Sequence, residues 1–283
     1  MKIAILGTEN SHAEAFAKLI RDDSDFQGLE LIGAYGYDEN ANRSLLEKGL
    51  VSRIADAPDG FLGEADAVLV TARHGDHHYE YALPYIKKGA SAFIDKPLTV
   101  KMEYADALLN AAKASGAMIC GGSSLKFLRD LDCLVDYAKG KRVIGGHVSA
   151  PVNMVNDYAG FYFYAQHLIE MMFRVFGSDV RSVFAYCPNA EKNRISVIFN
   201  YGDYDVTANY YSGYEYSACV MTDEGSRRIN TFDLGDCYKR ELEEFQTMLF
   251  TRVQPQTFEA LRKPVALMHM IEKSFREGTM VYA

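Results

Sequence analysis

The first 120 residues alternate short, almost continuously apolar runs with stretches whose apolar residues recur at helical spacing. The runs are KIAIL, LELIGAY, AVLVT, SAFI and AMIC, at residues 2–6, 29–35, 67–71, 91–94 and 117–120. Strands buried on both faces of a sheet have this pattern. The stretches between them predict helices at 11–21, 39–48, 78–88 and 101–115. This alternation indicates βαβ units and a doubly wound, Rossmann-type parallel sheet.

The pattern changes after Gly121 and Gly122. A helix is expected at 125–138, a strand at 143–152 and a helix at 164–176, followed by successive strands from 180 to 232 and two helices at 238–253 and 257–277. Strands joined by short turns indicate an antiparallel sheet. The predicted fold is therefore α/β: a dinucleotide-binding domain at 1–121, and an α+β domain at 122–283 with an open, mainly antiparallel sheet. A C-terminal helix has room to pack back on the first domain.

Composition excludes several classes of partner. The 283 residues carry a net charge of −8, which disfavours nucleic acid and anionic membranes. No apolar stretch approaches the ~18 residues that span a bilayer, and the N-terminus has no signal-like segment. The five cysteines are odd in number and form no C-x-x-C pair, so free thiols, no metal site and a cytoplasmic location are expected.

Ligands of parallel α/β domains bind at the carboxyl ends of the strands, so the loop after residue 6 is a candidate binding segment. It begins with Gly7, the first glycine of a G-x-G-x-x-G fingerprint, but Glu9 and His12 occupy the other two glycine positions. Ser11 and Glu14 have the spacing of a capping box. Both a dinucleotide loop and an ordinary strand–turn–helix remain open. In the first case the loop residues that contact the cofactor are Gly7, Glu9, Asn10, Ser11 and His12.

The loop after the second strand leaves the cofactor preference open. The position that usually holds an acid for the adenosine ribose is Gly36, and Asp38 follows two residues later. Arg43 is close enough in sequence to meet a 2′-phosphate, although it lies within a predicted helix. Asp38 is the candidate ribose contact, and the cofactor is either NAD or NADP.

Two further strand ends carry polar residues. Residues 74–78 hold three histidines and Asp76, a compact cluster for which loop capping with one ligand contact is favoured over metal binding. Lys96 follows strand 91–94 and precedes Pro97, which fixes the turn. An ammonium at such a strand end can bind a substrate hydroxyl, and partial burial would lower its pKa. The alternative for Lys96 is a solvated surface lysine.

Several motifs in collinear order resemble the glucose–fructose oxidoreductase / inositol dehydrogenase family. Thr71…His78…Gly89 followed by Asp95-Lys96-Pro97 resembles its T-P…H…G…E-K-P run. The resemblance continues through Lys126-Phe127 and the segment 166–170 to Gly278. It implies an NAD(P)-dependent oxidoreductase acting on a sugar, cyclitol or related polyol. It also implies a homodimer or homotetramer formed through the C-terminal sheet.

The resemblance assigns roles by position. Lys96 corresponds to the family's catalytic lysine and His167 to the histidine of its D-x-x-x-H motif. The cofactor set gains Thr71, Ala72, His74, His78, Asp95 and Lys96, and the substrate candidates are Lys126, Tyr158, Tyr162 and Phe163. The tyrosines of the later strands are interpreted as structural.

The chain departs from the family pattern at several positions. Phe163 stands where the motif has its aspartate, and Glu9 and Gly36 replace the second fingerprint glycine and the ribose acid. Two alternatives therefore stay open. One is a redox-inactive ligand-binding or regulatory protein, and the other is a cofactor-retaining lyase or glycosidase-like enzyme.

Overall fold

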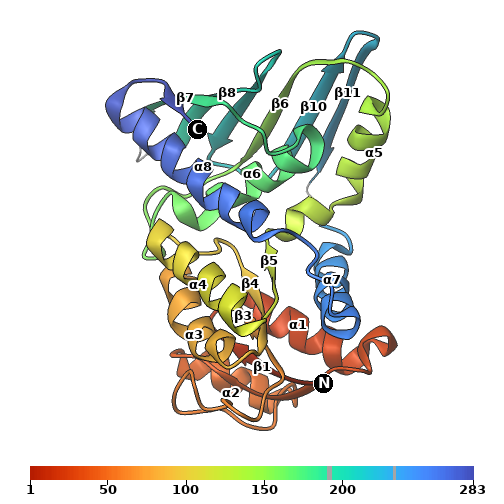
Figure 1. Ribbon diagram of the computed structural model, residues 1–283, viewed down its shortest axis with the longest axis vertical. Helices are drawn as coiled ribbons and strands as arrows, with labels where there is room; N and C mark the ends of the chain where they lie inside the picture. The colour runs from red at the N-terminus through yellow and green to blue at the C-terminus, as the bar shows by residue number, and fades with distance from the viewer. Residues whose placement is uncertain (190–192, 232–233) are drawn as a thin grey trace. The chain divides into compact units, whose positions relative to one another are not determined.

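The computed structural model (Figure 1) describes residues 1–189, 193–231 and 234–283. The chain forms two compact units. Unit 1 comprises Met1–Gly122 with Tyr238–Arg262, and unit 2 comprises Ser123–Cys237 with Lys263–Ala283. The sequence-based prediction divides the chain after residue 121 and allows a C-terminal helix to pack back on the first domain. In the structure the chain returns to unit 1 at residue 238, after completing the second sheet.

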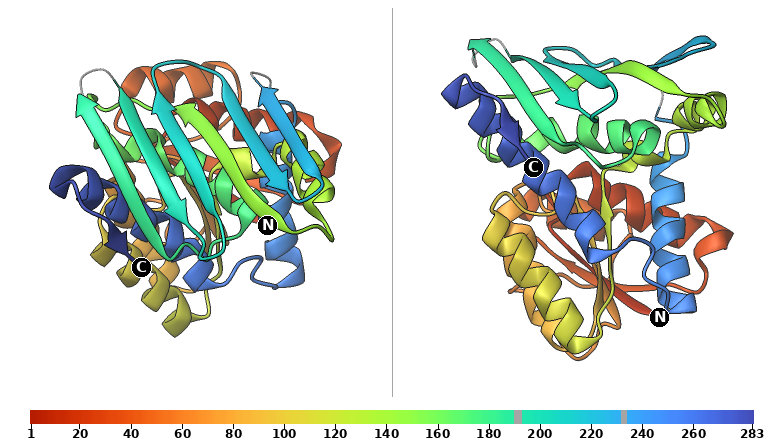
Figure 2. Two further views of the ribbon diagram at one scale, coloured as in Figure 1. Left: turned by 90° about the horizontal axis from the view of Figure 1, so that it is seen from above. Right: turned by 45° about the horizontal axis from the view of Figure 1, so that its top comes forward.

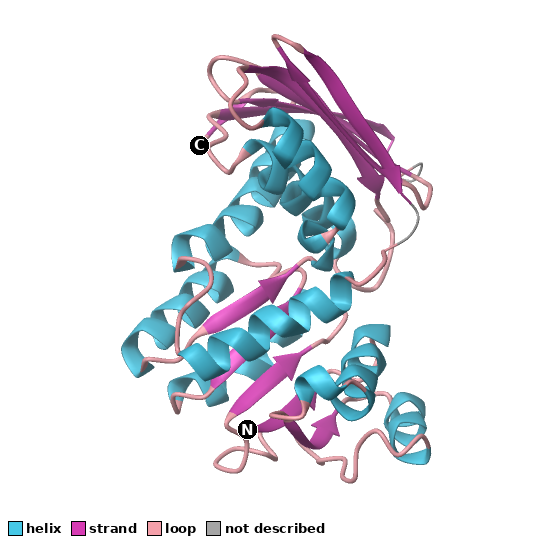
Figure 3. Cartoon of the chain, turned by 90° about the vertical axis from the view of Figure 1, so that its right-hand side faces the viewer, coloured by secondary structure: helices cyan, strands magenta, loops and turns pink. Residues whose placement is uncertain are grey.

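Unit 1 contains a five-stranded, wholly parallel sheet in the order β2-β1-β3-β4-β5. Its strands are β1 (Lys2–Leu6), β2 (Glu30–Tyr35), β3 (Ala67–Val70), β4 (Ser91–Asp95) and β5 (Ile119–Gly122). The connecting helices are α1 (Ser11–Asp22), α2 (Glu39–Glu47), α3 (Gly75–Lys87) and α4 (Met102–Ser115), with a short 3₁₀ turn at Ser24–Phe26. Helices lie on both sides of the strands (Figure 3). The predicted Rossmann-type sheet is confirmed.

Helix α7 (Cys237–Thr251) completes the core of unit 1. It contributes Leu242, Phe245, Met248 and Leu249 to the apolar cluster around β1 and α1. The Phe245 ring lies 6.0 Å from that of Phe93 on β4. A segment distant in sequence thus covers the face of the sheet on which α1 packs.

Unit 2 contains a seven-stranded sheet in the order β11-β10-β6-β9-β8-β7-β12. Its strands are β6 (Val143–Pro151), β7 (Ser182–Asn189), β8 (Arg194–Asn200), β9 (Asp205–Tyr211), β10 (Tyr216–Thr222), β11 (Gly225–Thr231) and β12 (Val281–Tyr282). β6 and β9 pair in parallel and the other neighbours are antiparallel, so the prediction of a mainly antiparallel sheet is confirmed. The last residue of the strand expected to end at 232 lies outside the described residues.

The helices of unit 2 are a 3₁₀ turn at Ser124–Phe127, α5 (Arg129–Ala138), α6 (Tyr162–Phe176) and most of α8 (Phe258–Glu277). They lie behind the sheet in Figure 2 (left), whose strands face the viewer. That outer face carries Phe184, Tyr186 and Ile198, each at least 36% exposed.

Two further expectations concern the whole chain. No helix in the described part of the chain is long and apolar enough to cross a membrane. Within the same residues, no cluster of histidine, cysteine, aspartate or glutamate could hold a metal ion.

Candidate active site

Gly7 ends β1 at a point where two loops of unit 1 approach each other closely. Its φ is +102°, and a Cβ atom there would lie 2.3 Å from the backbone nitrogen of Ala72. Thr71 Oγ1 donates a hydrogen bond to the Gly7 carbonyl at 2.7 Å. Glycine is therefore required here because the β1–α1 loop lies against the residues that follow β3. Thr71 and Ala72 hold the loop in place, and Thr71 is fully buried.

Helix α1 begins one residue earlier than the predicted capping box implies. Asn10 is the N-cap, with Oδ1 accepting from the His12 amide, and Ser11 is the exposed first residue of the helix. Glu14 instead contacts Lys18 at 2.6 Å and Lys48 at 2.7 Å. The capping-box prediction was wrong because Asn10 is also held from the other side, through its Nδ2 donating to Asp95 at 3.1 Å.

Glu9 occupies the second glycine position of the fingerprint, and one of its carboxylate oxygens bonds to the loop after β3 rather than to α1. Its Oε1 accepts from the backbone amide of Arg73 at 3.0 Å. Its Oε2 is buried and has no hydrogen-bond partner among the described residues. The side chain thus joins the β1–α1 loop to the β3–α3 loop, which explains how a carboxylate can stand in a fingerprint that binds phosphate.

Asp95, at the end of β4, is the centre of a buried polar cluster. Its Oδ2 lies 2.7 Å from His12 Nδ1, and its Oδ1 accepts from the Lys96 amide at 2.7 Å. On α7, the Tyr238 hydroxyl lies 3.0 Å from His12 Nε2. Burial raises the pKa of Asp95, but the charge and hydrogen bond of His12, together with the Lys96 charge, lower it to about 2. The carboxylate is therefore ionised at neutral pH.

Lys96 is 4% exposed. Burial lowers the pKa of its ammonium, the nearby Asp95 opposes that shift, and the positive charge of Arg73 adds to it. The solvated-lysine alternative does not describe this side chain, because it lies in the interior of unit 1 at the carboxyl end of a parallel strand. This is the edge of the sheet at which α/β domains bind ligands.

Gly36 stands at the position of the usual ribose-binding acid, and the side chain of Thr8 occupies the space beside it. A Cβ atom on Gly36 would lie 1.9 Å from Thr8 Oγ1. Thr8 Oγ1 donates to Asn42 Oδ1 at 2.7 Å, and Asn42 Nδ2 donates to the Gly36 carbonyl at 2.8 Å. Asp38 is the N-cap of α2, with Oδ1 accepting from the amides of residues 40 and 41. Asp38 is half-buried, and it is the first acidic residue after β2 in the sequence.

Two of the three histidines after β3, His74 and His78, contact backbone groups. His78 is fully buried, with Nδ1 2.6 Å from the Pro97 carbonyl and Nε2 2.7 Å from the Ala72 carbonyl. Burial lowers its pKa, against the effect of Asp95 and the two carbonyls. His74 is the N-cap of α3, accepting from the Asp76 amide, and burial also lowers its pKa. Both ring nitrogens of His78 thus face backbone carbonyls, and His74 Nδ1 caps the N-terminus of α3.

The candidate residues of unit 2 gather at the start of α6. His167 is 6% exposed, and its Nδ1 lies 2.7 Å from Ser123 Oγ. Ser123 Oγ also accepts from the Leu125 amide, and the Ser123 amide donates to Glu170 Oε1 at 3.0 Å. Lys126 Nζ lies 3.4 Å from the other oxygen of Glu170. Lys126 and His167, predicted separately, are thus linked through Ser123 and Glu170, which the sequence analysis did not single out as functional.

The aromatic substrate candidates have different surroundings. The Tyr162 hydroxyl donates to Glu272 at 2.6 Å and lies 3.2 Å from His269, both on α8, so this phenol connects two helices. Burial raises the pKa of Tyr162. The rings of Tyr158 and Phe163 lie 5.1 Å apart, centroid to centroid. Phe163 is half-buried at the position of the family's aspartate.

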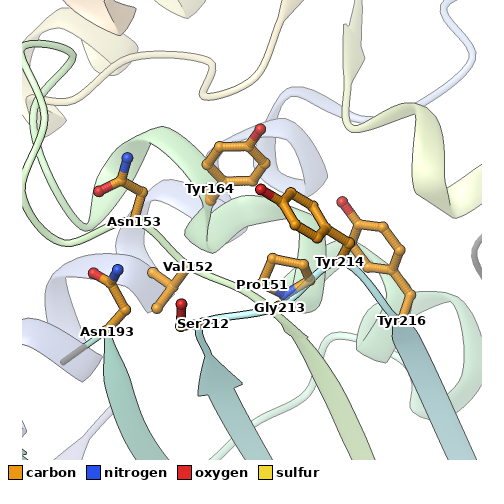
Figure 4. Close-up of a pocket in the computed structure, with 9 residues that line it drawn as sticks. All are labelled: Pro151, Val152, Asn153, Tyr164, Asn193, Ser212, Gly213, Tyr214 and Tyr216. Atoms are coloured by element: carbon orange, nitrogen blue, oxygen red, sulfur yellow. The ribbon is translucent and has the colours of Figure 1, made fainter.

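Unit 2 also contains a pocket of about 390 Å³ (Figure 4). Among the described residues it is lined by Pro151, Val152, Asn153, Tyr164, Asn193, Ser212, Gly213, Tyr214 and Tyr216. The Tyr164 and Tyr216 rings lie 5.5 and 6.3 Å from the imidazole of His167. Sequence analysis had interpreted Tyr214 and Tyr216 as structural, because the strand pattern does not reveal which residues from distant segments line one cavity.

Comparisons with known proteins agree with this architecture. Residues 1–122 match the Gfo/Idh/MocA family model, described as an oxidoreductase family with an NAD-binding Rossmann fold. No curated protein sequence matches the chain.

Among solved structures, a probable dehydrogenase from Thermotoga maritima is 18% identical, with a TM-score of 0.86 over 100% of this chain and 99% of that one. Myo-inositol 2-dehydrogenase from Lactobacillus plantarum is 15% identical, with a TM-score of 0.88 over 100% and 99%. Scyllo-inositol dehydrogenase from Lactobacillus casei, solved with NAD(H) and scyllo-inositol, is 15% identical, with a TM-score of 0.86 over 100% and 98%.

At these identities the structural likeness establishes the fold of the whole chain, while the family model covers its first 122 residues. The family match thus confirms the motif resemblance over residues 1–122. The N-terminal part of this chain, residues 1–122, matches the model of the Gfo/Idh/MocA oxidoreductase family with its NAD-binding Rossmann fold.

Proposed function

We propose that this protein is an NAD-dependent dehydrogenase that interconverts a hydroxyl and a keto group on a sugar, cyclitol or related polyol. The observation that carries the proposal is the burial of Lys96 at the carboxyl end of β4, in the part of the chain that matches the NAD-binding family model. Two of the three similar structures named above are dehydrogenases of myo-inositol and scyllo-inositol. Their substrates suggest the substrate class here.

The residues of unit 1 fit a dinucleotide. Gly7 lets the β1–α1 loop lie close to Ala72, and Glu9 accepts a hydrogen bond from the Arg73 amide. We therefore assign the pyrophosphate of the dinucleotide to the N-terminus of α1. Asp38 would bind the adenosine ribose. A carboxylate there would repel a 2′-phosphate, which favours NAD over NADP. When bound, NAD supplies the hydride acceptor for the substrate carbon.

Lys96 and His167 are assigned to the reacting hydroxyl. The Lys96 ammonium would donate a hydrogen bond to the substrate oxygen and stabilise negative charge on it. His167 Nδ1 faces Ser123, so the hydroxyl proton is assigned to Nε2. Ser123 and Glu170 would keep the imidazole in one orientation. This arrangement can orient His167 without the aspartate that Phe163 replaces.

A titration with NAD⁺, NADH, NADP⁺ and NADPH tests the cofactor, followed by absorbance of NADH in the presence of polyols. At 100 times its Kd, a bound dinucleotide stabilises the fold by ~2.7 kcal/mol, a visible thermal shift. Lys96→Ala should abolish turnover, whereas Lys87→Ala, on the exposed end of α3, should not. Unchanged turnover in Lys96→Ala would refute the assigned mechanism.

The filled ribose position at Gly36 favours one alternative, a ligand-binding protein without redox activity. No thermal shift with any of the four dinucleotides would select it. A cofactor-retaining lyase would convert its substrate with a dinucleotide bound and without net accumulation of NADH.

The outer face of the unit 2 sheet is the proposed interface of a homodimer or homotetramer. This face exposes three large apolar side chains, Phe184, Tyr186 and Ile198. Such a surface is suited to contact with a second copy of the chain. Sedimentation equilibrium of the wild type and of Ile198→Lys would test this. A monomeric wild type would refute it.

A further inference from the structure

The pocket of unit 2 is a cavity in addition to the place assigned to the reacting hydroxyl. His167 is not among its lining residues, but two of the lining rings, Tyr164 and Tyr216, contact the imidazole. If the reacting carbon of the substrate lies at His167, the pocket can therefore hold another part of the same substrate molecule. Its volume of about 390 Å³ is within the range of small-molecule sites.

The described lining residues carry no charged side chain. They offer three phenol rings, two amides and one hydroxyl, and Figure 4 shows the hydroxyls of Tyr164, Tyr214 and Tyr216 on one side of the cavity with Asn153 and Asn193 on the other. Burial raises the pKa of the Tyr216 phenol, which therefore stays a protonated donor. A phosphate or carboxylate group would need a cation here, whereas a neutral ring bearing hydroxyls would find both stacking faces and hydrogen-bonding groups.

The loop that carries Tyr214 is held in place. The Tyr211 hydroxyl donates to the Glu215 carbonyl at 2.5 Å, and a Cβ atom on Gly213 would lie 2.4 Å from the Tyr211 ring. Tyr214 itself is 88% exposed at the pocket. Because the Tyr214 ring is exposed and the backbone of its turn is held by these contacts, a ligand that stacks on the ring would bury a large apolar area.

We infer that this pocket binds a second, uncharged sugar ring, so that the substrate is a glycoside with one ring at His167 and the next between the tyrosines. The inference rests on the proposed function and narrows its substrate class. It also assigns Tyr214 a role in substrate specificity.

The test is titration calorimetry of the full chain with NAD⁺ present. The probes are neutral disaccharides of several linkages, their component monosaccharides, myo-inositol and a UDP-sugar. At least one disaccharide should bind about tenfold more tightly than both of its component monosaccharides. Tyr214→Ala should remove most of that advantage and leave the affinity for monosaccharides unchanged. Tyr186→Ala, an exposed ring on β7 outside the pocket, should have no effect.

Three results would overturn the inference: no disaccharide preferred over its components, tightest binding of the UDP-sugar, or an advantage that survives Tyr214→Ala. Thermal denaturation of each variant checks that the fold is intact. Because affinity is measured without turnover, the proposed function can fail separately. A disaccharide preference without any reduction of NAD⁺ would refute the redox assignment and keep the binding site.

Discussion

Substitution of Asp95 by asparagine tests the buried cluster at the end of β4. The pKa of Asp95 is lowered from 3.8 to about 2, which corresponds to about 2 kcal/mol of folding free energy at neutral pH. In the variant, the ionised partner of His12 and Lys96 is lost, and the new amide donor faces the side chain of Asn10. We therefore expect the unfolding free energy of unit 1 to fall by about 2 kcal/mol or more.

The assay is urea denaturation followed by circular dichroism, since the chain contains no tryptophan. Asp22→Asn is the matched control, because Asp22 pairs with Arg21 on an exposed surface and should contribute nothing measurable. A carboxylate with a lowered folded-state pKa stabilises the protein above its unfolded pKa, and the effect is lost as the pH falls. The difference between wild type and Asp95→Asn should thus be constant from pH 7 to 5 and shrink below pH 4. Equal stability at pH 7, or a difference that grows in acid, would refute this account.

The remaining predictions concern single contacts. Gly36→Ala would place a Cβ atom 1.9 Å from Thr8 Oγ1, so thermal denaturation should show a loss of about 1–3 kcal/mol; an unchanged midpoint would show that the loop can yield. Ser123→Ala removes the hydroxyl 2.7 Å from His167, so kcat/KM should fall about tenfold and its acidic limb should move; a lower rate with the same pH profile would indicate only a structural role. Burial lowers the pKa of Lys96, so the alkaline limb of kcat/KM should lie below pH 10.5, and a limb at or above that value would contradict it.

Much of the fold could be predicted because local patterns reflect burial. The strand predicted at 2–6 is β1, and the strand predicted at 91–94 is β4, which ends one residue later. Boundaries were less accurate where a cap depends on tertiary contacts. Asn10 rather than Ser11 is the N-cap of α1, and its side chain also donates a hydrogen bond to Asp95, 85 residues away.

The candidate site could be predicted only in part. Lys96 and His167 were found from strand-end position and motif resemblance, and the structure adds their surroundings. Nothing in the local sequence indicates that Ser123 contacts His167, since 44 residues separate them. The pocket tyrosines were missed for the same reason, because a strand pattern shows which face a ring occupies and not which cavity it meets.

The sequence by itself determined the two kinds of sheet and the position of the polar residues at the strand ends, because hydrophobic periodicity and turn residues act locally. The tertiary structure decided the burial and the partners of each of those residues. His78, a cofactor candidate in the sequence, joins the carbonyls of Ala72 and Pro97, while Asp95 and Lys96 lie in a buried charged cluster. Burial and partner charges set the pKa of an ionisable group, and both come from segments far apart in the chain.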